Sequence, residues 1–158
     1  MADSKTSDDE ERRKEQKPAI TNEEAAALAC RIWPQLLGSG VRKIKPLESY
    51  DDQNFYVERV SDGERFLLKV HNGVESAPDS VAVLDAQNAV MLHLAAKGVI
   101  CSKPIATPAG AHSAHVPLRT RGAGDVPLCV RLLEWVAGDT MNALGDAADG
   151  ALLEDAGR

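Results

Sequence analysis

The chain has 158 residues, a formal net charge of −6 and a hydrophobic content of 44%. This length and composition suit one globular domain with its own core. The negative charge argues against a general nucleic-acid-binding protein or one that binds anionic membranes. No apolar run approaches the ~20 residues of a membrane-spanning helix, and the three cysteines are scattered, as in reduced intracellular proteins. We therefore expect a cytoplasmic protein with neither nucleic-acid nor membrane partners.

Residues 1–18 combine six acidic with five basic side chains and contain few apolar ones. Such a segment buries too little apolar surface to offset the entropy lost on ordering. It is predicted to be a disordered, charged tail that ends at Pro18.

The segment TNEE, residues 21–24, has the pattern of a capping box, with Thr21 as the N-cap and Glu24 three residues later. The apolar residues that follow predict an amphipathic helix. Pro34 should end or kink this helix near Trp33, because proline cannot continue a helical hydrogen-bond ladder. We expect the helix to support a sheet.

A run of short strands follows the helix. Apolar and branched residues on both sides of the Asp62-Gly63 turn are a strong signal for a β-hairpin. With the segment VRKIKPL before them, the two strands of this hairpin would make an antiparallel meander. The three strands are expected at residues 41–47, 55–60 and 65–70. A polar loop, residues 48–54, would join the first two.

Lys69 lies in an otherwise apolar strand, in the sequence FLLKV. Alternation puts Phe66, Leu68 and Val70 on one face of this strand and Lys69 on the other. Because an unpaired buried ammonium is too costly, the lysine must either point to solvent or bind an anion. In the second case, backbone N–H groups of the polar loop could contact the same anion. The residues alone leave both alternatives open.

A second helix is expected at residues 78–98, where Pro78 marks the start and Gly98 the end. The segment after it, residues 99–127, is rich in proline, glycine, serine and alanine, and holds at most one strand, near residues 114–118.

Within that segment, His112 and His115 have HxxH spacing but lack a third ligand, so they are expected to lie in a solvated loop. Residues 128–136, LCVRLLEWV, form the most apolar predicted strand. This strand should lie in the interior of the sheet.

The loop SYDDQNF and the strand pair that ends in LLKV resemble the nucleotide-binding lobe of the aminoglycoside phosphotransferase-like kinases. The similarity covers residues 41–158 in order, through LDAQNAVMLHLAAKG, CVRLLEWVAG and GALLEDAGR. It implies an α+β fold, a protein-kinase-like N-terminal lobe of about five antiparallel strands with a packed helix. The lobe would occupy residues 19–144, and residues 145–158 would begin a second lobe.

The resemblance implies that the polar loop covers the nucleotide phosphates and that Lys69 contacts them. In kinase-like folds an acid on the packed helix orients this lysine; Asp85 is the first candidate and Gln87 the alternative. Asp51 and Asp52 would repel bare phosphate, so they should point outward or toward a metal. The strand at 128–136 would lead into the hinge beside the purine. The residues expected to contact nucleotide are Ser49, Gln53, Asn54, Lys69, Asp85, Glu134, Trp135 and Val136.

The activity that the resemblance implies is transfer of the γ-phosphoryl of GTP or ATP to a hydroxyl of a small aminated molecule, with 5-hydroxylysine as the first choice. The family motif HGDxxxxN, which supplies the catalytic aspartate and a Mg²⁺ ligand, does not occur in the sequence. We therefore expect a kinase fragment that is inactive alone, with its catalytic residues and Mg²⁺ ligands in a second lobe. The alternatives are a non-catalytic module that binds nucleotide or protein, and a choline, homoserine or aminoglycoside kinase-like enzyme.

Overall fold

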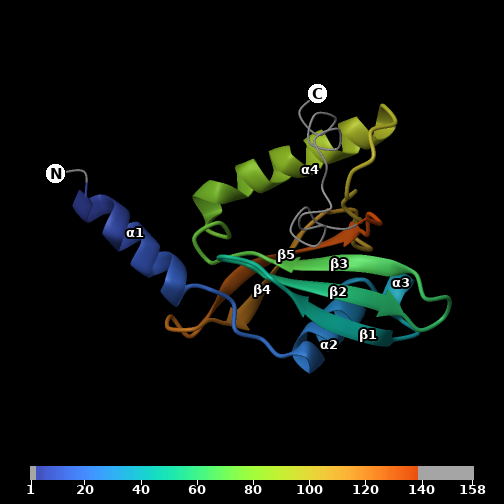
Figure 1. Cartoon of the computed structure of the whole chain (residues 1–158), viewed down its shortest axis with the longest axis horizontal. Coiled ribbons are helices and arrows are strands. Elements are labelled where there is room, and N and C mark those ends of the chain that lie inside the picture. Colours follow the sequence, from blue (N-terminus) through green and yellow to red (C-terminus); the bar gives the residue numbers. More distant parts are fainter. Residues whose placement is uncertain (1–2, 139–158) are drawn as a thin grey trace, which may run out of the picture.

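Within the described residues, a five-stranded antiparallel sheet with the strand order β1-β2-β3-β5-β4 is the centre of the fold. The computed structural model describes residues 3–138, and Figure 1 shows the sheet between α2 and α3 on one side and α4 on the other. The strands are β1 Val41–Leu47, β2 Gln53–Arg59, β3 Arg65–Val70, β4 Ala114–Arg119 and β5 Asp125–Glu134. The helices are α1 Asp3–Glu15, α2 Asn22–Ile32, α3 Pro34–Leu37 and α4 Val81–Ala96, the last preceded by the 3-10 turn η1 Pro78–Ser80. The predicted α+β architecture of about five antiparallel strands with a packed helix is confirmed.

The predicted meander is also confirmed, since β1 pairs with β2 and β2 with β3, both antiparallel. The bounds of β1 and β3 are those expected, whereas β2 begins earlier, at Gln53. Gly63 in the hairpin turn has a φ of 74°, the left-handed conformation that the Asp-Gly pair predicts. The apolar strand β5 lies inside the sheet, between β3 and β4.

The core lies between the sheet and α2. Phe66, Leu68 and Val70 are at most 1% exposed and face the helix, as the alternation of β3 predicts. The capping box of α2 forms in both directions: the Glu24 amide donates to Thr21 Oγ1 at 3.2 Å, and the Thr21 amide donates to Glu24 Oε2 at 2.7 Å. The helix α2 therefore begins at the residue that the sequence indicates.

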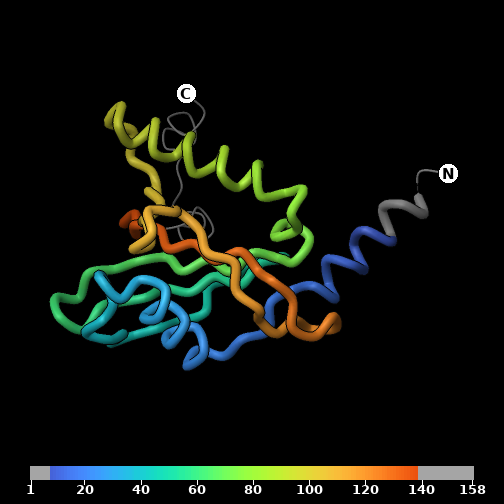
Figure 2. The backbone as a smooth tube through the Cα atoms, turned by 180° about the vertical axis from the view of Figure 1, so that it is seen from behind, coloured from blue at the N-terminus to red at the C-terminus, as the bar shows by residue number. Residues whose placement is uncertain are grey.

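The N-terminal segment differs from its prediction, because residues Asp3–Glu15 form the helix α1 instead of a disordered tail. Backbone hydrogen bonds tie the end of this helix to distant loops: Gly73 N donates to Gln16 O at 3.1 Å, and Arg121 N to Lys17 O at 2.9 Å. Figure 2 shows the chain after α1 passing beside the loop between β4 and β5. The composition argument fails because it counts apolar burial alone, whereas this segment is held by polar contacts.

The predicted start of a second lobe, residues 145–158, lies outside the described residues, so the domain boundaries stay predictions. Within residues 3–138, no helix combines the length and the apolar character needed to cross a membrane.

Leu68→Ala should lower the free energy of unfolding by about 2–5 kcal/mol, because the Leu68 side chain is fully buried and its truncation leaves a cavity. Urea unfolding followed by circular dichroism measures the loss. Ile100→Ala is the control, since Ile100 is 87% exposed and should change stability by less than about 0.5 kcal/mol. Equal effects of the two substitutions would show that the core is not where the structure places it.

Candidate functional site

The face of the sheet opposite α2 carries two rows of side chains with different chemistry. Strand register places Tyr56, Leu67 and Leu133 side by side across β2, β3 and β5. Two residues along the strands, a distance of roughly 7 Å, the same register aligns Asn54, Lys69 and Arg131. We call these the apolar row and the polar row. Three aromatic or aliphatic side chains thus lie next to two cations on one side of one sheet.

Lys69 in the polar row forms an ion pair with Asp52, which lies in the β1–β2 loop, residues 48–52. The Asp52 carboxylate is buried and also accepts a hydrogen bond from the Asn72 amide at 2.9 Å. Burial raises the pKa of Asp52, but the hydrogen bond and charge of Lys69 outweigh it, so the pKa lies below its ordinary value. The expectation that Asp52 points outward or toward a metal is therefore wrong, because it neutralises the lysine.

Asp85, the predicted partner of Lys69, does not contact it among the described residues. Its side chain is exposed on α4 and lines a small cavity with His112 and Ser113. The lysine finds its counter-charge in the nearby loop instead, where Asp52 meets the end of β3.

The alternative partner, Gln87, also faces another residue, the buried Arg131 in the polar row. The Arg131 guanidinium donates through Nη2 to Gln87 Oε1 at 3.2 Å and through Nη1 to Asn88 Oδ1 at 2.9 Å. Its Nε donates to His71 Nε2 at 2.9 Å. Arg131 therefore joins α4 to the sheet, a role that sequence reasoning missed. The sequence did contain a signal for this role: Arg131 is a charged residue within the most apolar strand, the same pattern that singled out Lys69.

His71 directly follows β3 and is 1% exposed, and its lowered pKa leaves the ring neutral at pH 7. Burial and, secondly, the charge of Arg131 lower the pKa of His71 to about 4. Because Nε2 accepts from Arg131, the proton of the neutral ring sits on Nδ1, which donates to Glu75 Oε2 at 3.2 Å.

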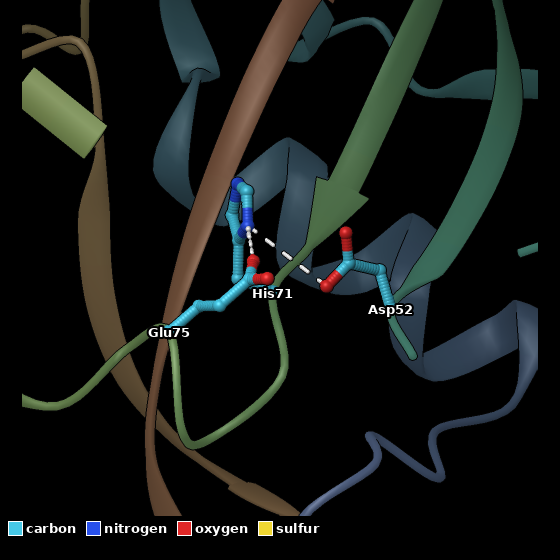
Figure 3. A group of neighbouring side chains, drawn as sticks. All are labelled: Asp52, His71 and Glu75. Atoms are coloured by element: carbon cyan, nitrogen blue, oxygen red, sulfur yellow. Dashed lines mark hydrogen bonds and ion pairs between the residues drawn. The ribbon is translucent and has the colours of Figure 1, made fainter. Parts of the chain in front are cut away.

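Asp52, His71 and Glu75 are the three side chains that come close enough for a shared metal ion within residues 3–138 (Figure 3). They do not fit the Mg²⁺ that the family resemblance implies. Both ring nitrogens of His71 are already committed to hydrogen bonds, and the two carboxylates are paired with Lys69 and Arg13. Mg²⁺ prefers oxygen ligands in octahedral geometry. The cluster is thus an ion-pair and hydrogen-bond network that needs no metal to balance its charges.

The predicted loop residues have different environments. The Gln53 amide makes two hydrogen bonds of 3.0 Å with the backbone of Ile20, which engage both ends of its side chain. The Ser49 carbonyl accepts from Lys17 Nζ at 2.9 Å. Within residues 3–138, Asn54 Oδ1 is buried without a hydrogen-bond partner. Asn54 lies beside Lys69 in the polar row, where an unsatisfied polar atom is consistent with a ligand-binding position.

The three predicted hinge residues lie at the end of β5, near the apolar row. The Trp135 ring packs edge-on against Tyr56, with ring centroids 5.1 Å apart. Glu134 pairs with Lys103 at 2.8 Å, and Val136 is 38% exposed. A cavity of about 490 Å³ opens here, lined mainly by apolar side chains of the β5 end and of the segment after α4. This arrangement suits a flat aromatic base better than a charged group.

The family model described as "Phosphotransferase enzyme family" matches residues 43–158. The chain is similar to the hydroxylysine kinase of Xenopus laevis, 34% identical over 126 residues that make up 77% of this chain and 32% of that protein. It is 33% identical to the hydroxylysine kinase of Danio rerio over 128 residues, which make up 81% of this chain and 34% of that protein. It is 30% identical to the hydroxylysine kinase of Mus musculus over 128 residues, which make up 77% of this chain and 32% of that protein. The chain thus spans about a third of the length of these relatives.

The stability of the fold should fall as the pH is lowered from about 6.5 to about 4. An unfolded histidine takes up its proton near pH 6.5, whereas His71 in the folded chain does so only near 4. The unfolded state therefore binds more protons in this window, and stability on the order of 3 kcal/mol is lost across it. The lowered pKa of Asp52 acts mainly below pH 3.8 and contributes only weakly at the acid end of this window.

Urea unfolding at several pH values between 7 and 4 measures this loss. His71→Gln should flatten the dependence, because an amide can accept from Arg131 without titrating. His93→Gln is the control, since His93 is exposed on α4. If both variants keep the slope of the unchanged chain, His71 is not its source.

Proposed function

This chain belongs to the phosphotransferase enzyme family, and we propose that its sheet binds a nucleoside triphosphate as the N-terminal lobe of a small-molecule kinase. One observation carries the proposal: the apolar row and the polar row lie next to each other on the face of the sheet opposite α2. The spacing of roughly 7 Å between the rows is of the size that separates a nucleotide base from its phosphates.

In this arrangement the base packs against the apolar row, with Trp135 and Val136 at its edge. The phosphates lie against Lys69, whose ammonium keeps two protons for them after the pair with Asp52. Asp52 orients the lysine, the role that an acid on the packed helix has in other kinase-like folds. The free acceptor of Asn54, next to Lys69, is a candidate for a proton donor on the ligand or its hydration shell.

Phosphoryl transfer depends almost entirely on positioning and on charge stabilisation. This chain would supply the positioning of the nucleotide and the Lys69 ammonium as a hydrogen-bond donor to its phosphates. A catalytic aspartate and metal ligands would belong to the part of the relatives that this chain does not span, about two thirds of their length.

The proposed acceptor is 5-hydroxylysine, supported by the names of the three relatives. The proposed phosphoryl donor is GTP or ATP. An apolar surface and backbone groups can hold either guanine or adenine, so no side chain need select one of the two bases. A cytoplasmic location is proposed on the basis of composition and scattered cysteines alone.

Removal of the Lys69–Asp52 pair should weaken nucleotide binding without unfolding the chain. Lys69→Ala alone would leave the buried Asp52 carboxylate without its counter-charge, which is itself destabilising. The double variant Lys69→Met/Asp52→Asn removes both charges together. Titration with N-methylanthraniloyl GTP and ATP should show at least about tenfold weaker binding by the double variant. In a longer protein that also contains the second lobe of the family, the same change should lower kcat/KM about a hundred- to a thousandfold.

Lys14→Met/Glu10→Gln is the matched control, because it removes an exposed ion pair of 2.9 Å from α1 and such pairs contribute little. Nucleotide binding by the Lys69 and Asp52 variant equal to that of the control would rule out the phosphate role.

The chain alone should bind nucleotide but transfer no phosphate. Incubated with Mg²⁺, GTP and 5-hydroxylysine, it should release no more GDP than buffer does, because HGDxxxxN is absent from its sequence. Release that increases with protein concentration would show that these residues contain a complete catalytic site.

A further inference from the structure

We propose that residues 13–20, which we call the clamp segment, position the β1–β2 loop for nucleotide binding; this inference rests on the proposed function. The segment lies before residue 43, where the family match begins. Its side chains nevertheless reach the loop that carries Asp52.

Arg13 is the first contact of the clamp segment. Its Nη1 donates to Asp51 Oδ2 at 3.0 Å and to Glu75 Oε1 at 3.4 Å. The guanidinium therefore bridges the β1–β2 loop to the loop that follows β3. Charge-assisted hydrogen bonds of this kind are stronger and more directional than neutral ones.

Lys17 and Ile20 hold the loop on either side of Asp52. Lys17 Nζ donates to the carbonyls of Ser49, at 2.9 Å, and Tyr50. The Ile20 backbone makes its two hydrogen bonds with Gln53. Contacts thus fall before and after Asp52 along the chain. The Tyr50 ring is 80% exposed, so little apolar packing holds this part of the loop.

Asn72, which is fully buried, joins these contacts to the ion pair. Its side-chain Nδ2 donates to Arg13 O at 2.8 Å and to Asp51 O at 3.3 Å, while its backbone N–H donates to Asp52. A displacement of the clamp segment therefore reaches Asp52, and through Asp52 the Lys69 ammonium. The clamp residues act as positioning residues, because they fix the loop and do not face the two rows themselves.

The test compares two double variants of the 158-residue chain. Arg13→Ala/Lys17→Ala removes the side-chain contacts with the loop. Arg12→Ala/Lys14→Ala removes the same charge from the same stretch of chain, where the partners, Asp9 and Glu10, belong to α1 itself. Long-range attraction of an anionic nucleotide changes equally in both, so a difference between them reports the loop contacts.

The clamp variant should bind N-methylanthraniloyl GTP and ATP about tenfold more weakly than the control variant. Its amides at residues 49–53 should exchange with deuterium faster, with and without nucleotide. Arg13→Lys/Lys17→Arg, which keeps donors at both positions, should restore most of the affinity and of the protection from exchange.

Each other outcome overturns the proposal in a different way. If the clamp variant loses melting temperature but keeps its affinity, the segment only stabilises the fold. If the amides of the loop exchange at the same rate in the clamp and control variants, the contacts do not hold the loop. If the unchanged chain binds neither nucleotide, the proposed function fails, and the role of the clamp segment fails with it.

Discussion

The pairing of Lys69 with Asp52 is the constraint on which the candidate site depends. An ammonium inside a five-stranded sheet loses much of its hydration, and only a nearby anion makes that position tolerable. The anion comes from a loop and not from a helix, so the geometry of the site depends on how this loop is held. The buried Asn72, the clamp segment and the end of β3 all contribute to holding it.

Arg131, one strand away, is stabilised in a different way, by neutral hydrogen-bond acceptors instead of an anion. Its guanidinium is buried and satisfied by His71, Gln87 and Asn88, none of which carries a formal charge at pH 7. The face of the sheet therefore combines one cation that is partly open to solvent, Lys69, with one that is closed. Lys69 is the one that can contact a ligand, whereas Arg131 fixes α4 to the sheet.

Local sequence patterns predicted most of the fold. Alternation in β3, the Asp-Gly turn and the capping box at Thr21 each depend on residues within a few positions of one another. The partners of the charged residues could not be predicted in this way, because Arg131 and His71 are 60 positions apart and Arg13 and Asp51 are 38 apart. Such pairs depend on tertiary placement, and the family resemblance suggested Asp85 where this chain uses Asp52. The N-terminal segment was misjudged for the same reason, since its ordering comes from loops far along the sequence.

A crystal structure of the chain with a non-hydrolysable GTP or ATP analogue tests most directly the claim that the two rows form the nucleotide site. The two rows predict a phosphate oxygen within hydrogen-bond distance of Lys69 Nζ, the Asp52 pair intact, and the base against Tyr56, Leu67 and Leu133. Phosphates bound away from Lys69, or a base that does not touch the apolar row, would contradict the assignment of this face as the nucleotide site.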